Sequence, residues 1–561
     1  MFCKVLRAVA LVLLAVSSVR AAQFVTETNA SAPKVMPASD EGERAMMRFR
    51  IPKGFKVELF AAEPMLANPV AFAIDEKGRF FVAETFRLHS GVTDIRGHMS
   101  WLDEELASTS VEERIEIMKR HEGKRISDYT RESDRVRFIW DNDGDGKADK
   151  ATVFADGFNG IAEGIGSGLL AHHGNIYYAN IPNLWSLRDE NKDGIADSKK
   201  SLLYGFGVRV GFLGHDLHGL RIGPDGKLYF TIGDRGAHVV TKEHTNDKIV
   251  ANHEEGVVYR CNLDGSGLEI FARGLRNPQE LAFDAYGNLW TGDNNSDGGD
   301  PARWVYVVEG GDSGWRVGYQ FLTQPNARGV WLSERMCYPQ FPGQAAFMVP
   351  PVANIGNGPS GLAYYPGAGL SDRYTNHFFL SDFRGSTDSG VHSFSVRPKG
   401  AGFEVYDRHN FVWELLATDG DFGYDGCFYI SDWVQGWNKT GKGRIYRVFD
   451  PEHVKSRAVK EAKEFFAQGF DAMPTHRLAD LLNHADMRVR QEAQFALVAR
   501  GPVTAVRTFA NTVRTSAHQF ARLHAIWGLG QIAARSALAV SELTRLLDDQ
   551  DAEVRAQAAR V

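Results

Sequence analysis

The chain has 561 residues, of which 43% are hydrophobic and 24% are charged, as in ordinary soluble globular proteins. This balance excludes a disordered chain and a protein with many membrane spans. The net charge of −6, from 64 basic and 70 acidic residues, gives no sign of a nucleic-acid-binding surface. The 57 glycines, 35 phenylalanines and 17 tyrosines favour a turn-rich β fold.

The first 22 residues have the pattern of a secretory signal peptide. Lys4 and Arg7 form a basic start, residues 8–19 are mostly apolar, and small residues follow at a suitable cleavage position. The apolar stretch is too short to span a bilayer, and an uncleaved anchor is the alternative. We therefore expect an exported protein, periplasmic or extracellular, with membrane association left open. Residues 23–49 are small and polar and predict a flexible leader.

One unit recurs six times: an apolar strand, a glycine turn, and a short β-branched or aromatic strand that ends in a polar residue. The copies cover residues 72–84, 169–180, 222–234, 283–293, 361–382 and 422–432. A single unit cannot bury both faces of its strands, whereas a closed ring of six can. Residues 50–450 therefore predict a six-bladed β-propeller, with an open β-sandwich as the alternative. A helical insertion is expected at about 101–134, where Ser110 and Glu113 form a capping box.

The pattern becomes helical after the predicted propeller. Residues 451–473 predict a helical connector. Leu478 recurs as Leu543, 65 residues on, and a middle copy lies 32 residues after the first. This period predicts helical hairpins similar to HEAT repeats over residues 474–561, on which a protein partner could dock. The last repeat is expected to be incomplete, because no helix-stop signal precedes the end of the chain.

Two acidic loops share the pattern D-x-[DN]-x-D-G-x-x-D. Their candidate ligands are Asp141, Asp143, Asp145 and Asp149 in the first loop, and Asp189, Asn191, Asp193 and Asp197 in the second. Oxygen ligands at these positions suit Ca²⁺, and the glycine permits the tight turn. Neither loop is an EF-hand, because Thr152 and Lys200 stand where an EF-hand has glutamate. We predict two structural calcium sites. A pair of turns without metal is the alternative.

Polar residues cluster where the inner strands of the blades begin, close to the channel of the predicted propeller. Blade three carries Gly214-His215-Asp216-Leu217-His218-Gly219, and blade four carries Gly274-Leu275-Arg276-Asn277-Pro278-Gln279. At these residues the chain resembles the soluble quinoprotein sugar dehydrogenases of the glucose/sorbosone dehydrogenase family. That family consists of six-bladed propellers that hold pyrroloquinoline quinone (PQQ) and calcium. The resemblance implies PQQ and Ca²⁺ as cofactors. It also implies His215 as catalytic base, Asp234 as its carboxylate partner, and Arg276, Asn277 and Arg384 as cofactor contacts.

The implied chemistry is coherent, although the sequence departs from the family at two places. Oxidation of a hydroxyl group requires a base for the O–H proton while hydride leaves the carbon. Two arginines that clamp the cofactor in the family correspond here to Leu416 and Thr418. A Gly-Pro pair that offers carbonyl groups to the cofactor's calcium corresponds to Asp293-Asn294, so an acidic cluster would have to bind calcium differently.

The layout as a whole is similar to a group of exported planctomycete proteins described as membrane-bound dehydrogenases. These proteins join such a propeller to HEAT-like repeats and a haem-binding cytochrome c domain. This chain has no C-x-x-C-H motif, so we expect no haem in it. The first hypothesis is a dehydrogenase of a sugar or other alcohol that passes electrons to a quinone or haem partner, such as a cytochrome c. The second is a non-catalytic propeller that binds polysaccharide or protein.

Overall fold

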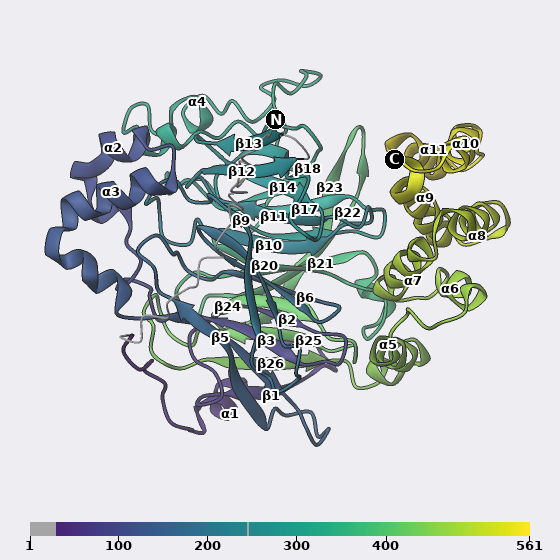
Figure 1. The fold of residues 1–561 in the computed structure, drawn as a ribbon, viewed down its shortest axis with the longest axis horizontal. Coiled ribbons are helices and arrows are strands. Elements are labelled where there is room, and N and C mark those ends of the chain that lie inside the picture. The colour runs from purple at the N-terminus through teal and green to yellow at the C-terminus, as the bar shows by residue number, and fades with distance from the viewer. Residues whose placement is uncertain (1–29, 244–245) are drawn as a thin grey trace, which may run out of the picture.

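The computed structural model describes residues 30–243 and 246–561, and the predicted signal peptide lies outside them. Six four-stranded antiparallel sheets form a ring, which confirms the predicted six-bladed propeller. The inner strands β2, β6, β10, β16, β20 and β24 contact one another around the channel. Figure 1 shows the propeller from the side, with helices at both of its ends.

Blades one to five follow chain order from the inner strand outward. Their strands are β2 (Pro69–Ile74), β3 (Phe80–Glu84), β4 (Asp134–Trp140) and β5 (Lys150–Phe158); β6 (Gly168–His172), β7 (Asn175–Asn180), β8 (Asn183–Arg188) and β9 (Ser198–Tyr204); β10 (Leu217–Ile222), β11 (Leu228–Ile232), β14 (Gly256–Cys261) and β15 (Glu269–Leu275). Blades four and five consist of β16 (Pro278–Phe283), β17 (Leu289–Asp293), β18 (Arg303–Val307) and β19 (Ala353–Asn354); β20 (Pro359–Tyr364), β21 (His377–Asp382), β22 (Gly390–Lys399) and β23 (Gly402–Trp413). A separate hairpin, β12 (Ala237–Glu243) and β13 (Asn246–Asn252), extends from blade three.

The sixth blade closes the ring with the first strand of the chain. It consists of β24 (Ala417–Phe422), β25 (Phe428–Asp432), β26 (Arg444–Phe449) and β1 (Lys56–Ala62). β1 runs antiparallel to β26, with Lys56 opposite Phe449. The two ends of the propeller segment are therefore held together by backbone hydrogen bonds, which closes the ring.

The structure describes residues 30–49 of the predicted flexible leader (residues 23–49), and it corrects the prediction for this part. Helix α1 (Glu41–Met46) packs on the sixth blade. Glu41 pairs with Lys442 and Arg444, and Tyr446 donates its hydroxyl to the carbonyl of Gly42 at 3.2 Å. Contacts with a distant strand hold this segment, and its own composition does not reveal them.

Two helices form between β3 and β4, at one mouth of the ring. They are α2 (Leu102–Ala107) and α3 (Val111–Glu122), with short 3-10 turns η1 (Ile95–Gly97), η2 (Met99–Trp101) and η3 (Gly123–Thr130). Glu105 of α2 accepts the backbone N–H of Val210 at 3.0 Å, and Ser110 caps the start of α3. Blade four contributes η4 (Val317–Phe321) and α4 (Gly329–Leu332), and blade five contributes η5 (Asp372–Tyr374).

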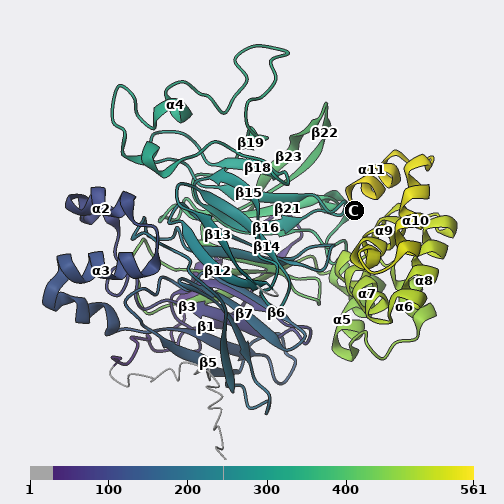
Figure 2. The same ribbon diagram turned by 45° about the horizontal axis from the view of Figure 1, so that its top comes forward.

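The C-terminal helices lie at the opposite end of the ring (Figure 1 and Figure 2). They are α5 (Arg457–Gln468), α6 (Thr475–Leu481), α7 (Met487–Ala499), α8 (Pro502–Thr515), α9 (Gln519–Ala533), α10 (Ala537–Arg545) and α11 (Ala552–Arg560), with 3-10 turns η6 (His453–Lys455) and η7 (Leu546–Asp548). One continuous apolar core joins them. None of the described helices combines the length and the apolar composition that crossing a bilayer requires.

Glutamine side chains dock these helices on the propeller. Gln494 of α7 donates to the carbonyl of Pro224 at 2.7 Å, and Gln557 of α11 donates to the carbonyl of Tyr286 at 2.8 Å. Both carbonyls belong to the turns that follow inner strands. The helical segment therefore covers the mouth at which the inner strands end, and the mouth at which they begin faces the insertion.

Candidate functional site

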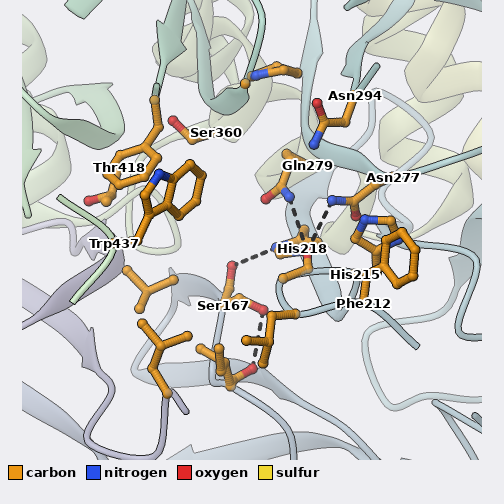
Figure 3. Close-up of a pocket in the computed structure, with 18 of the residues that line it drawn as sticks. Ser167, Phe212, His215, His218, Asn277, Gln279, Asn294, Ser360, Thr418 and Trp437 are labelled. Atoms are coloured by element: carbon orange, nitrogen blue, oxygen red, sulfur yellow. Dashed lines mark hydrogen bonds between the residues drawn. The ribbon is translucent and has the colours of Figure 1, made fainter. Parts of the chain in front are cut away.

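A cavity of about 540 Å³ lies at the mouth where the inner strands begin. Every blade contributes a residue at or next to the start of its inner strand: Val70, Ser167, His218, Gln279, Ser360 and Thr418. Figure 3 labels Ser167, His218, Gln279, Ser360 and Thr418 around the cavity, together with His215 and Asn277. Because strand starts from distant parts of the chain converge here, the ring builds one site from six blades.

His215 and Asp234 form a hydrogen-bonded pair at the cavity. Nδ1 of His215 lies 2.6 Å from Oδ1 of Asp234, and both side chains are buried. The other carboxylate oxygen of Asp234 accepts the indole N–H of Trp315 at 2.9 Å. Burial raises the pKa of Asp234, but His215, Arg276 and this indole N–H act against burial and bring the pKa below its ordinary value. Within the described residues no hydrogen bond engages Nε2 of His215, which leaves that nitrogen for a ligand.

The hairpin of β10 and β11 explains why the two residues meet. His215 lies two residues before β10, Asp234 lies two residues after β11, and Leu217 pairs with Ile232. The antiparallel register therefore brings the two side chains to the same end of the blade. The family resemblance implied this pair, and the register of the hairpin explains why the two side chains meet.

The carbonyl group of Gly214 anchors the loop that carries His215. It accepts N–H groups from His218 at 2.9 Å and from Asn277 and Gln279 at 3.1 Å each (Figure 3). Blades three and four thus hold one peptide group from three directions. This arrangement restricts the motion of the neighbouring imidazole.

Arg276 and Asn277, which the resemblance implied as cofactor contacts, both line the cavity. The guanidinium group of Arg276 is buried and donates to Gln320 at 2.9 Å and to Asp297 at 2.9 Å. Oδ1 of Asn277 is buried and has no hydrogen-bond partner in the described part of the chain. The oxygen of Asn277 is therefore a buried acceptor without a partner in the described residues, whereas Arg276 is already paired with an acidic group.

Arg384 lies outside this group, which differs from the sequence-based expectation. Its guanidinium group pairs with Asp382 at 2.7 Å and with Asp388 at 2.8 Å, and it does not line the cavity. The wall next to it is aromatic instead: the rings of Phe383 and Trp437 lie 4.8 Å apart between their centroids. The carboxylates on either side of Arg384 hold its guanidinium group away from the cavity.

The two positions that depart from the sugar dehydrogenases have structural roles here. Leu416 is buried, and Thr418 donates its hydroxyl group to the carbonyl of Pro69 at 3.1 Å. Asp293 accepts the backbone N–H of Asn277 at 2.7 Å and pairs with Arg303 at 2.8 Å. Asp293 is therefore fully engaged by protein groups, and the expected calcium binding by an acidic cluster at this position finds no support.

The remaining cavity residues fit a planar anionic quinone. The guanidinium groups of Arg96 and Arg276 line the cavity, where Arg96 pairs with Asp94 at 2.7 Å and Arg276 pairs with Asp297 at 2.9 Å. Trp437 and Phe383 offer flat apolar surface, and a cavity of about 540 Å³ can hold a tricyclic ring system together with a small substrate. The indole N–H of Trp433, like the amide oxygen of Asn277, is buried without a partner among the described residues.

The predicted calcium loops lie far from this cavity, in the outer hairpins of blades one and two. In the first loop, carboxylate oxygens of Asp141, Asp143 and Asp145 lie within 4.8 Å of one another. In the second loop, the carboxylate of Asp189 accepts the backbone N–H of Gly194 at 2.9 Å. The remaining candidate ligands also form hydrogen bonds within their own loops. They are Asp149, Asn191, Asp193 and Asp197.

Each of these loops also contacts the preceding blade in the ring. Ala148 donates its backbone N–H to the carbonyl of Phe60 in the sixth blade at 2.8 Å. The carbonyl of Gly194 accepts the hydroxyl group of Thr152 in the first blade at 2.6 Å. The loops therefore lie at the junctions between blades.

Sequence reasoning missed Trp315, and Trp437 also belongs to the site. Trp315 lies in the long loop between β18 and β19, where no motif marks it. Trp437 follows the last copy of the recurring unit and lines the cavity. A tryptophan conveys no role by itself, because most tryptophans pack in cores.

Comparison with known proteins identifies the family. Residues 41–452 match the family described as a domain of unknown function (DUF7133), and the chain belongs to this family. Residues 475–561 match HEAT repeats, which confirms that prediction.

The propeller is also similar to quinoprotein sugar dehydrogenases. The chain is 34% identical over 125 residues to quinoprotein glucose dehydrogenase B of Acinetobacter calcoaceticus, a match that covers 18% of this chain and 26% of that protein. The PQQ-bound aldose sugar dehydrogenase of Streptomyces coelicolor has 17% identity and a TM-score of 0.41, covering 71% of this chain and 99% of that chain. The apo aldose sugar dehydrogenase of Escherichia coli has 16% identity and a TM-score of 0.41, covering 70% and 99%.

Proposed function

We propose that the cavity is the active site of a dehydrogenase that oxidises a hydroxyl group of a sugar or another alcohol, with His215 as general base. The observation that carries the proposal is the 2.6 Å hydrogen bond between Nδ1 of His215 and Asp234, which turns Nε2 to the substrate side. The carboxylate holds the imidazole in one tautomer and stabilises the imidazolium ion that forms. The similarity to quinoprotein glucose dehydrogenase B supports the same class of reaction.

In the proposed reaction Nε2 of His215 takes the proton of the substrate hydroxyl group, hydride leaves the same carbon, and a carbonyl group forms. The chemistry that PQQ supplies when bound is a two-electron acceptor for the hydride. Arg276 and Asn277 would hold this group, Arg276 through its positive charge and Asn277 through its amide group. Phe383 and Trp437 give one side of the cavity an aromatic surface.

Three further parts of the proposal concern the surroundings of the site. The two acidic loops bind Ca²⁺ in a structural role, supported by their oxygen sets and their position between blades. The protein is exported and acts in the periplasm or outside the cell, and the sequence pattern of residues 1–22 supports this. Electrons leave to a separate acceptor, such as a cytochrome c, and the HEAT repeats offer a surface for protein contact.

The test measures reduction of an artificial electron acceptor by the purified full chain, incubated with PQQ and Ca²⁺ and a panel of sugars and alcohols. His215→Ala is expected to lower kcat by about 10²–10⁴-fold. His476→Ala, an exposed histidine of α6, serves as the matched control and should leave activity unchanged. Activity that survives His215→Ala contradicts the assignment of the base.

A second candidate function is a binding propeller without redox chemistry. The pairing of Arg276 with Asp297, and Leu416 and Thr418 at the positions of the clamping arginines, favour it. Three measurements distinguish the two candidates. The binding function predicts that PQQ leaves the absorbance spectrum unchanged and that no substrate reduces the acceptor. It also predicts that a polysaccharide binds, as measured by calorimetry.

A further inference from the structure

Two imidazoles and two carboxylates converge where the propeller meets the C-terminal helices. His172 and His173 lie at the turn between β6 and β7, Glu76 lies at the turn between β2 and β3, and Glu492 lies on α7. One ligand atom from each of Glu76, His172 and His173 lies within 4.8 Å of the other two. Figure 2 shows α7 at this end of the propeller, near β6 and β7. The dehydrogenase proposal uses none of these residues.

The backbone brings the two consecutive histidine rings to the same side. Neighbouring residues of a strand normally point to opposite faces. Here His173 has φ 49° and Gly174 has φ 75°, as in a two-residue hairpin turn of the primed type. The ring centroids of His172 and His173 are consequently only 4.1 Å apart. Histidine seldom adopts positive φ, so this turn holds an unusual conformation that presents both rings together.

Glu492 reaches both rings from the helical segment. Its Oε2 lies 3.0 Å from Nε2 of His173, whereas its Oε1 lies 3.8 Å from Nδ1 of His172, which is too long for a hydrogen bond. Glu76 accepts the backbone N–H of His173 through Oε1 at 2.6 Å, which orients this carboxylate on the same turn. Two separate parts of the fold therefore aim nitrogen and oxygen ligands at one small volume.

The charge around the cluster favours a cation. The acidic groups that act on His173 are Glu492, Glu76 and Asp471, and Glu492 also acts on His172.

We propose that His172, His173, Glu76 and Glu492 bind one Zn²⁺ ion that joins the propeller to the HEAT repeats. Two imidazole nitrogens and the Glu76 carboxylate lie within 4.8 Å of one another, and Glu492, 3.0 Å from His173, would supply the fourth ligand of a tetrahedral Zn²⁺ site. Calcium prefers ligand sets made only of oxygen, so this site differs chemically from the acidic loops. Because Glu492 belongs to α7 and the other three ligands belong to blades one and two, the ion would hold two domains in one arrangement.

The test uses the full chain, first stripped of metal and then titrated with Zn²⁺ by calorimetry in excess Ca²⁺, which occupies the acidic loops. We expect one Zn²⁺ per chain, with X-ray absorption reporting imidazole and oxygen ligands at about 2.0–2.2 Å. His172→Gln and Glu492→Gln should each weaken binding by at least about tenfold. His476→Gln and Glu464→Gln, exposed residues of α6 and α5, serve as matched controls and should bind as the wild type does.

Absence of Zn²⁺ binding by the wild-type chain would overturn the proposal. Equal binding by His172→Gln and the wild type, with unchanged circular dichroism, would also overturn it. A second measurement tests the joining role. Zn²⁺ should slow proteolysis between residues 450 and 475 in the wild type and not in Glu492→Gln, and equal cleavage with and without Zn²⁺ would refute that role.

Discussion

Trp315 donates its indole N–H to Oδ2 of Asp234 at 2.9 Å, on the carboxylate whose other oxygen lies against His215. Trp315 is fully buried in the loop between β18 and β19, 81 residues from Asp234 in the sequence. The orientation of the pair at the cavity therefore depends on a long loop of the next blade. A hydrogen bond to a buried carboxylate is among the stronger ones in proteins.

Trp315→Phe tests this dependence, because it keeps an aromatic ring and removes the N–H. We expect the free energy of unfolding to fall by about 1–3 kcal/mol, since a buried carboxylate oxygen loses its donor. We also expect kcat to fall about tenfold with little change in KM. Trp304→Phe is the matched control, because its equally buried N–H has no partner in the described part of the chain. Equal kcat in the two variants would contradict the positioning role.

Stability should depend on pH through carboxylates in the channel. Arg221 lies 3.2 Å from Glu280 and 3.4 Å from Asp421. Burial raises the pKa of Glu280 above its ordinary value of 4.5, and the neighbouring Asp419 and Asp421 raise it further against Arg221. The folded chain then binds more protons than the unfolded chain above pH 4.5, so the free energy of unfolding falls as pH rises through the raised pKa.

Glu280→Gln removes that titration. The melting temperature of the variant should therefore fall less than that of the wild type between about pH 5 and about pH 8. Glu464→Gln, an exposed change on α5, should follow the wild-type curve. Parallel curves for Glu280→Gln and the wild type, recorded by differential scanning calorimetry, would contradict the prediction.

Ring closure should depend on Phe60 of β1. Its ring centroid lies 4.6 Å from that of Phe80 in the first blade and 5.4 Å from that of Tyr429 in the sixth. Phe60→Ala should lower the free energy of unfolding by about 3–5 kcal/mol, because it opens a cavity between two blades. Phe347→Ala, at a side chain that is 80% exposed, should change it by less than about 0.5 kcal/mol. Denaturant titration measures both, and a small effect at Phe60 would contradict its closing role.

Docking of the helical segment should depend on Gln494. This buried side chain donates to the carbonyl of Pro224 at 2.7 Å and lies 2.8 Å from Nδ1 of His524 through its oxygen. Gln494→Leu leaves both partners unsatisfied, so we expect a loss of about 2 kcal/mol or more. Limited proteolysis should then release residues 475–561 faster than in the wild type. Gln468→Leu, at an exposed position of α5, is the control, and equal rates in the two variants would contradict the prediction.

The calcium loops make a prediction about metal removal. Chelation should lower the melting temperature, and added Ca²⁺ should restore it, because bound Ca²⁺ stabilises only the folded chain. Asp143→Ala should reduce this shift, and the double variant Asp143→Ala/Asp193→Ala should abolish it. Asp103→Ala, at an exposed position of α2, should keep the full shift. No shift of the wild type at millimolar Ca²⁺ would mean that the loops are turns without metal.

Much of the candidate site could be predicted wherever the geometry is local. His215 and Asp234 belong to one hairpin, and the register of β10 and β11 determines that they meet. Arg276 and Asn277 could be placed because they precede an inner strand of the next blade. The orientation of Arg384 could not be predicted, because its guanidinium group pairs with both Asp382 and Asp388, and only the folded geometry shows that these pairs hold it away from the cavity.

The sequence by itself determined the architecture, because strand, turn and helix periods are written in short stretches of neighbouring residues. Six copies of one unit required a closed ring to bury their strands, and a period of about 32 residues required stacked helical hairpins. The tertiary structure alone decided that β1 completes the sixth blade, that the helices cover one mouth, and that the cavity opens at the other. These features depend on contacts between residues hundreds of positions apart. No local periodicity encodes such contacts, because they form only when the packed surfaces fit.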